Sequence, residues 1–180
     1  KQAVALPGQY SLGDPNPKFN MSFINNLNYK GWLTFNMQWD WVAGAHIYNQ
    51  TKQWMYRDGI HSDYDIPVLI AGQSFAYTAF YRSMYAGGAA NGTKNYFYED
   101  ASFVRLRNIF FGVDLNKFAK LKAFTRLQLV LSGRNLVTFT PYTGMDPEAN
   151  YSTNSAFDRG LDHNTIPNTK QYTIGLNVGF

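Results

Sequence analysis

The fold of this chain is decided by the stretch Leu33-Thr34-Phe35-Asn36-Met37-Gln38-Trp39-Asp40-Trp41. Large apolar side chains occupy every second position, and polar side chains fill the positions between them. Successive side chains of a β-strand point to opposite faces, whereas a helix would bring Phe35 and Trp39 together and turn Met37 away. The pattern therefore predicts a strand with one apolar face and one polar face.

The segment before this strand repeats the pattern. Phe19–Tyr29 alternates in the same way, with Ile24 and Asn25 as the exceptions. The dipeptide Lys30-Gly31 separates the two alternating runs and is typical of a tight turn. The two runs therefore predict an antiparallel hairpin.

Alternation returns in three later segments. It is seen around Phe103–Leu115, around Leu127–Leu131 and in Tyr172–Phe180. The phase slips near Arg107, which predicts a β-bulge. The connections are predicted to be a long loop over Ala43–Ala101, a compact charged turn over Asn116–Lys122 and a second long loop from roughly Gly133 to Thr169.

The composition supports strands and excludes several classes of protein. The 180 residues are 45% hydrophobic, 17% aromatic and 16% charged, with a mean hydropathy of −0.34. No run of about 18 apolar residues exists, which excludes a transmembrane helix but permits alternating strands. The net charge of +4 is scattered along the chain, so nucleic acid is not an expected partner. Because there is no Cys, neither a disulfide framework nor a thiolate metal site is expected.

Short and long connections alternate along the chain, as they do in outer-membrane β-barrels. Short turns lie on the periplasmic side of such barrels and long loops on the extracellular side. Five strands cannot close a barrel, and open strand edges in lipid would cost tens of kcal/mol. The expected fold class is all-β, a transmembrane antiparallel β-barrel of which the chain supplies the last strands. Because Lys1 follows no initiator Met or signal peptide, we expect further sequence upstream, or a separate chain that supplies the other strands.

Several motifs resemble the C-terminal region of SusC/RagA proteins, the TonB-linked nutrient transporters of Bacteroidota outer membranes. The resemblance covers nearly the whole chain apart from residues 43–98. It is carried by Gly13-Asp14-Pro15-Asn16-Pro17, Glu99-Asp100-Ala101-Ser102-Phe103-Val104-Arg105-Leu106-Arg107-Asn108, Ser132-Gly133-Arg134-Asn135-Leu136-Val137-Thr138-Phe139-Thr140, Tyr142-Thr143-Gly144-Met145-Asp146-Pro147-Glu148 and Ile166-Pro167-Asn168-Thr169-Lys170-Gln171-Tyr172.

This resemblance implies a function as well as a fold. Residues 1–180 would be the C-terminal portion of a plugged barrel of about 22 strands, with the plug domain and the earlier strands absent from this chain. A SusD-like surface lipoprotein would capture an oligosaccharide or a peptide, and the TonB complex, acting through the missing N-terminal region, would drive import across the outer membrane. The resemblance implies no cofactor and no enzymatic step.

Three groups of residues are candidates for functional roles. We expect Asn36, Gln38, Asp40, Thr173 and Asn177 to face the lumen, and Phe35, Met37, Trp39, Ile174 and Leu176 to face lipid. Aromatic side chains of the first long loop are candidates for contact with a ligand or partner. They are Trp54, Tyr56, Tyr77, Phe80, Tyr81 and Tyr85. In outer-membrane barrels a terminal aromatic residue is read by the assembly machinery, a role we assign to Phe180.

Other readings of the sequence are weaker. His61, Asp63 and Asp65, with Asp58 nearby, could hold a metal, but calcium-loop spacing is absent and a plain polar loop is favoured. Asp146-Pro147-Glu148 could be a pair of catalytic carboxylates, but Pro147 favours a turn. A soluble β-sandwich lectin is the main alternative function, although its apolar faces would be buried and its turns short throughout. A glycoside hydrolase would need a carboxylate pair at defined spacing, which the sequence does not place.

Overall fold

The computed structural model describes residues 8, 10–65, 68–70, 72–75, 94–119, 124–152 and 159–179. The chain forms two compact units. The sheet unit consists of Lys18–Ala43, Ser102–Pro141 and Pro167–Phe180. The loop unit consists of Lys1–Pro17, Gly44–Ala101 and Tyr142–Ile166. Phe180 lies outside the described residues, so its assignment as an assembly signal stays a prediction.

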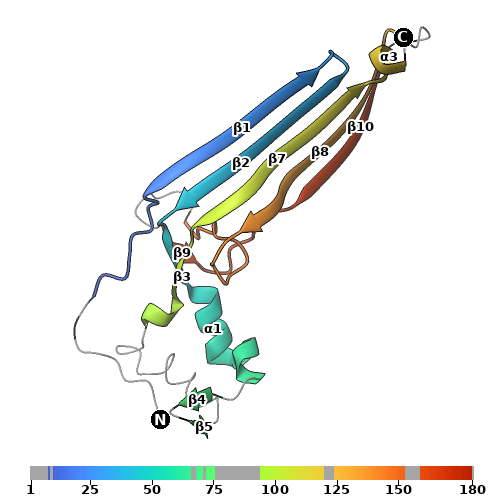
Figure 1. Cartoon of the computed structure of the whole chain (residues 1–180). Helices are drawn as coiled ribbons and strands as arrows, with labels where there is room; N and C mark the ends of the chain where they lie inside the picture. The colour runs from blue at the N-terminus through green and yellow to red at the C-terminus, as the bar shows by residue number, and fades with distance from the viewer. Residues whose placement is uncertain are drawn as a thin grey trace. The chain divides into compact units, whose positions relative to one another are not determined.

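The sheet unit is one antiparallel sheet of five long strands in the order β1-β2-β7-β8-β10 (Figure 1). The strands are β1 (Phe19–Tyr29), β2 (Leu33–Ala43), β7 (Phe103–Asp114), β8 (Arg126–Phe139) and β10 (Gln171–Gly179). The short helix α3 (Leu115–Ala119) follows β7. All five alternating segments of the sequence are therefore strands of one sheet, as predicted.

The turn between β1 and β2 follows from its two central residues. Lys30 and Gly31 both have positive φ, 48° and 70°, as a type I′ turn requires. The Trp32 amide donates to the Tyr29 carbonyl at 3.2 Å, and Asn28 Oδ1 accepts from the Gly31 amide at 3.1 Å. The predicted tight hairpin is confirmed.

The pairing register gives the sheet two chemically distinct faces, because directly paired residues of antiparallel strands point to the same side. Phe35 pairs with Leu27 and Phe111, and Asn36 pairs with Asn26. The apolar face carries Phe23, Phe35, Met37, Trp39, Ile109, Phe111, Leu129, Leu131, Ile174 and Leu176. The polar face carries Ser22, Asn36, Gln38, Asp40, Asn108, Gln128, Ser132, Thr173 and Asn177. The residues expected to face lipid share one side and those expected to face the lumen share the other, while the environment of each side stays a prediction.

Large side chains of the apolar face are exposed. Phe23 is 55% exposed, Leu131 42% and Ile174 79%. This exposure does not fit a β-sandwich, in which such side chains are buried against a second sheet. Among the described strands none pairs with the outer edge of β1 or of β10. The apolar face of the sheet and the outer edges of β1 and β10 are therefore not covered by the described strands.

A bulge interrupts the middle strands where the sequence phase slips. The register between β7 and β8 shifts between Leu106 and Asn108, so Arg107 lies at the shift. On β8 the shift is accompanied by Asn135, whose φ is +51°. The predicted bulge near Arg107 is confirmed. The second long loop was expected from about Gly133, but β8 continues to Phe139, because pairing resumes beyond the bulge with Leu106 opposite Val137.

The loop unit has secondary structure of its own, which the sequence pattern did not predict. Its strands β3 (His46–Asn49), β6 (Tyr98–Asp100) and β9 (Leu161–Asp162) form a small sheet in the order β6-β3-β9, with β3 and β9 parallel. The pair β4 (Val68–Ile70) and β5 (Gln73–Phe75) forms a second small sheet. Helical segments are α1 (Gln50–Asp58), η1 (Ser62–Asp65) and η2 (Lys94–Phe97). No helix in the described parts of the chain is long and apolar enough to cross a membrane.

Both ends of helix α1 are marked by residue types that commonly cap helices. Asn49 is its N-cap, and the Asn49 side chain accepts from the Lys52 amide at 2.8 Å. Gly59 ends the helix with φ of 73°, a left-handed conformation that glycine adopts without strain. The helix places Tyr56 in an aromatic core with Tyr64 and Phe97.

Candidate functional site

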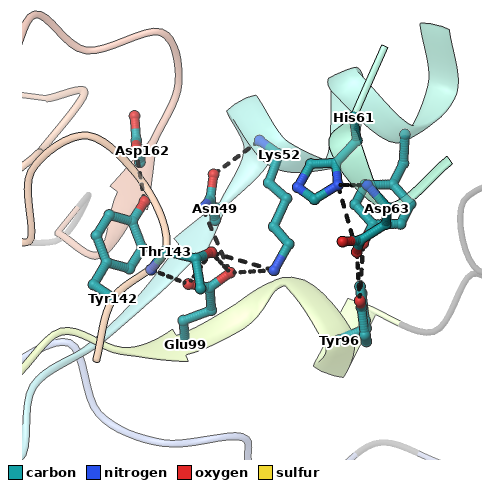
Figure 2. Close-up of polar contacts among 10 residues, drawn as sticks. Asn49, Lys52, His61, Asp63, Tyr96, Glu99, Tyr142, Thr143 and Asp162 are labelled. Atoms are coloured by element: carbon teal, nitrogen blue, oxygen red, sulfur yellow. Dashed lines mark hydrogen bonds and ion pairs between the residues drawn. The ribbon is translucent and has the colours of Figure 1, made fainter. Parts of the chain in front are cut away.

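The candidate site is a polar network in the loop unit that joins the two long loops (Figure 2). At its centre the Glu99 carboxylate accepts from Lys52 Nζ at 3.0 Å. The same carboxylate accepts from the backbone amide of Thr143 and from the Thr143 hydroxyl, both at 2.8 Å. The Lys52 and Glu99 side chains are only 14% and 11% exposed, so this ion pair is largely removed from water. The first loop supplies Lys52 and Glu99, and the second loop supplies Thr143.

A second connection between the loops is centred on Asp162, which is 4% exposed. The Tyr142 hydroxyl donates to Asp162 Oδ2 at 2.6 Å, and the Thr51 hydroxyl donates to Asp162 Oδ1 at 3.3 Å. The Thr51 hydroxyl in turn accepts from the Asn164 amide at 2.8 Å. Burial and the bond to Asp162 raise the pKa of Tyr142, so this phenol stays a proton donor. The paired loops therefore form one hydrogen-bonded body.

Glycine positions explain why the segment Gly13-Asp14-Pro15-Asn16-Pro17 packs onto this body. Gly13 has φ of +146°, and a Cβ there would lie 2.8 Å from the His46 ring. The Asp14 carbonyl accepts from the His46 amide at 2.9 Å. At Gly160 a Cβ would lie 2.5 Å from Pro15, so only glycine admits this contact. Because Gly13 and Gly160 have no side chain, their backbone can pack directly against His46 and Pro15.

Tyr56 is a core residue, which corrects its assignment as a ligand contact. It is 0% exposed, and its ring packs edge-on to Phe97 at a centroid distance of 5.4 Å. Its hydroxyl donates to Asp63 and lies 2.8 Å from the Tyr96 hydroxyl. Burial raises the pKa of Tyr56, which keeps the phenol protonated. A ring enclosed in this way stabilises the loop unit and offers no surface to a ligand.

His61 and Asp63, named as possible metal ligands, lie next to each other in the loop unit. The His61 Nδ1 accepts from the Asp63 amide at 3.1 Å, and it lies 3.4 Å from the Asp63 carboxylate. Burial lowers the pKa of His61, consistent with a neutral ring whose Nδ1 carries no proton. Asp58 is instead bound to Arg57. Within the described residues, no group of three or more His, Cys, Asp or Glu side chains gathers that could hold a metal.

Trp54 lies in a row of contacting side chains that the sequence did not reveal. The Arg57 guanidinium lies 5.3 Å from the Trp54 ring centre, and the His163 ring meets Trp54 edge-on at 4.5 Å. Tyr151 stacks on His163 at 4.7 Å and is 59% exposed. We call Arg57, Trp54, His163 and Tyr151 the aromatic row. The other loop aromatics proposed for contact, Tyr77, Phe80, Tyr81 and Tyr85, lie outside the described residues.

The polar face of the sheet has its own charged cluster at the bulge. Asp40 Oδ2 accepts from Arg107 Nε at 2.6 Å, and Asp40 Oδ1 accepts from the Ser22 hydroxyl and from Gln38 Nε2. Arg107 also donates to Asn135 Oδ1 at 3.3 Å. The extra residue at the bulge thus brings a guanidinium to the carboxylate of a neighbouring strand. Sequence analysis named Gln38 and Asp40 but did not identify Arg107 as their partner.

Asp146-Pro147-Glu148 forms a turn. Asp146 Oδ1 accepts from the Glu148 amide at 2.9 Å, and the Asp146 carbonyl accepts from the Ala149 amide at 3.0 Å. The first carboxylate is therefore engaged with the backbone that follows it. This confirms the turn that Pro147 indicated.

Some of the residues that sequence analysis missed in the network lie in segments that carry the family resemblance. Glu99 opens one such motif, and Tyr142 and Thr143 open another. Lys52 had no comparable signal beyond its place in the first turn of a capped helix. What the sequence lacked was any indication that these segments touch one another.

Comparisons with known proteins agree with this architecture. No protein-family model matches the chain. TonB-dependent receptor P3 of Formosa agariphila is 35% identical over 174 residues, which is 94% of this chain and 17% of the receptor. TonB-dependent receptor P26 of the same organism is 25% identical over 94% of the chain and 18% of that receptor. The chain thus spans less than a fifth of the length of these relatives.

Solved structures show the same fold. The structure of the RagAB peptide transporter matches 96% of this chain and 19% of its own chain, with a TM-score of 0.60 at 23% identity. The RagAB peptide importer in its open-open state matches 98% of this chain and 20% of its own chain, with a TM-score of 0.59. The two-faced sheet with alternating short and long connections is a segment of an outer-membrane β-barrel. Over 94% of its length the chain is similar to a TonB-dependent receptor, and it has the fold of the matching part of the RagAB peptide transporter.

Proposed function

We propose that this chain is part of a receptor that imports an oligosaccharide or a peptide across the outer membrane, driven by TonB. The observation that carries the proposal is the sheet itself. One face is apolar and exposed, the other is polar, and the edges are open to further strands. In a bilayer such a sheet is stable only as part of a closed barrel, with lipid on the apolar face and the lumen on the polar face.

The loop unit supports a role in recognition on the extracellular side. Both long connections, which follow β2 and β8, belong to it, while the short connections join the opposite ends of the strands. Loops held on a rigid scaffold commonly carry binding residues. The aromatic row offers the exposed ring of Tyr151, which is linked to Trp54 through His163, and aromatic rings suit contacts with sugar rings, peptide side chains or a partner protein.

The proposed partner is a SusD-like surface lipoprotein, and the plug and TonB-contacting parts belong to sequence outside this chain. The RagAB structures are described as a peptide transporter and peptide importer, which supports peptides as one ligand class. Import of this kind is gated binding, in which no covalent bond of the ligand changes. The relatives are named as receptors and transporters, in keeping with a protein that is not an enzyme.

The test is uptake by cells that produce the complete receptor with its lipoprotein, supplied with labelled peptide or oligosaccharide mixtures. We expect uptake of one mixture that disappears when TonB is removed. The double variant Trp54→Ala and Tyr151→Ala should lower that uptake roughly tenfold, since each aromatic contact is worth about 0.5–1.5 kcal/mol. Ile166→Ala, which changes an 88% exposed side chain outside the aromatic row, is the control. Uptake that persists without TonB would contradict the proposal.

A further inference from the structure

The short-connection end of the sheet carries a group of aromatic side chains at the border of the apolar face. Tyr29 lies on that face at the end of β1, and its ring meets Trp32 edge-on at 5.8 Å. Trp32 in turn contacts Phe118 of α3 at 5.0 Å. Tyr29 and Phe118 are 47% and 60% exposed. Figure 1 shows α3 and the β1–β2 turn at the same end of the sheet.

Two lysines lie in the same two short connections as these rings. The ammonium of Lys30 is 5.1 Å from the centre of the Tyr29 ring. Lys117 Nζ donates to the Gly31 carbonyl at 3.2 Å, which holds the two short connections together. Lys117 Nζ also lies 3.8 Å from the Asp114 carboxylate, and the Lys117 side chain is 63% exposed. We call Tyr29, Lys30, Trp32, Lys117 and Phe118 the turn patch.

The chemistry of the turn patch combines two binding properties. Exposed aromatic rings at the edge of an apolar sheet face suit the interfacial zone of a bilayer. Ammonium groups at the same depth attract phosphate. Two lysines and one aspartate leave an excess of positive charge, so a headgroup with net negative charge is favoured over a zwitterionic one.

We propose that the turn patch binds the headgroup of an anionic phospholipid, such as phosphatidylglycerol, in the periplasmic leaflet. This inference rests on the proposed function, because it needs the short connections to lie at the periplasmic surface of the outer membrane. The lipid phosphate is held by Lys30 and Lys117, and its acyl chains lie along the apolar face beside Tyr29 and Trp32. The bound lipid fixes the two short turns relative to each other.

The experiment uses the complete receptor, extracted from outer membranes and titrated with phosphatidylglycerol or with phosphatidylethanolamine in native mass spectrometry. The double variant Lys30→Gln and Lys117→Gln should lose affinity for phosphatidylglycerol about thirtyfold, or about fivefold for each lysine. Its affinity for phosphatidylethanolamine should not change. Lys18→Gln, an exposed lysine at the other end of β1, is the matched control and should bind like the unaltered receptor.

Several outcomes would overturn the inference. Equal phosphatidylglycerol binding by the double variant and the control would show that the lysines do not hold the headgroup. Displacement of the lipid by millimolar inorganic phosphate would show a free-anion site instead. If the double variant fails to assemble, two further measurements replace it. The charge-preserving variant Lys30→Arg with Lys117→Arg must still bind phosphatidylglycerol. Binding of phosphatidylglycerol to the unaltered receptor must weaken as the salt concentration is raised. Absence of the unaltered receptor from the outer-membrane fraction would instead contradict the proposed function.

Discussion

At the scale of single residues, the Lys52–Glu99 pair and the Arg57–Asp58 pair show how burial decides what an ion pair contributes. Lys52 and Glu99 are largely buried, whereas Arg57 and Asp58 are 44% and 47% exposed. An exposed pair gains little because water screens it. Removing one partner of a buried pair leaves a charge without solvation, which costs about 3–5 kcal/mol. The two pairs lie in the same unit and make a matched comparison.

We predict that Glu99→Ala destabilises the loop unit by about 3–5 kcal/mol, whereas Asp58→Ala has little effect because water already screens the exposed Arg57–Asp58 pair. Lys52 would keep its place near the Tyr96 ring but lose its carboxylate partner. The measurement is the rate of protease cleavage within the loop unit of the assembled receptor, which follows the population of the open form. Glu99→Ala should be cut at least a hundredfold faster than Asp58→Ala. Similar rates for the two variants would show that the network does not hold the loops together.

At the scale of elements, β2 offers a direct comparison of the two sheet faces. Met37 is in the middle of β2 on the apolar face, and its neighbour Asn36 is on the polar face. We predict that Met37→Arg costs about 2–4 kcal/mol, as expected for a charge near the bilayer midplane, while Asn36→Arg costs much less. The measurement is unfolding of the complete receptor by denaturant in lipid vesicles. Equal costs at the two positions would argue against lipid on the apolar face.

The strands could be predicted because their signal is local. A period of two within β1, β2 and β10 records which side chains share a face, so residues a few positions apart were enough. The second half of β8 was missed because the bulge at Asn135 breaks the period within the strand. Helix α1 was missed although Asn49 and Gly59 mark its ends, because its apolar residues Trp54, Met55 and Tyr56 are consecutive and show no helical period.

The polar network could not be predicted for a different reason. Thr51 and Asp162 are separated by 111 positions, and Glu99 and Thr143 by 44. No periodic pattern relates such residues, and each alone is an ordinary polar residue of a loop. The aromatic content of the loops did suggest binding, but exposure separates the enclosed Tyr56 from the accessible Tyr151, and exposure is a property of the folded unit.

At the scale of the whole molecule, the outer edges of β1 and β10, which pair with no other described strand, need further strands if the sheet is to be stable in lipid. Unpaired strand edges cost several kcal/mol for each backbone group in lipid. We predict that residues 1–180 produced alone form no species that resists SDS at room temperature, whereas the complete receptor migrates as a compact, heat-modifiable band. The measurement is electrophoresis with and without boiling. A compact band from residues 1–180 alone would show that the segment closes on itself or pairs with further copies.

The parallel pairing of β3 with β9 constrains the order in which the loop unit can fold. Tyr48 aligns with Leu161 in this pairing, and both β7 and β8 are encoded between them. The first loop can therefore pair β3 with β6 by itself, but the other edge of β3 is completed only by a strand that is encoded after β7 and β8. A chain that ends before Leu161 would leave that edge of β3 without β9, so the two long loops complete their fold only together.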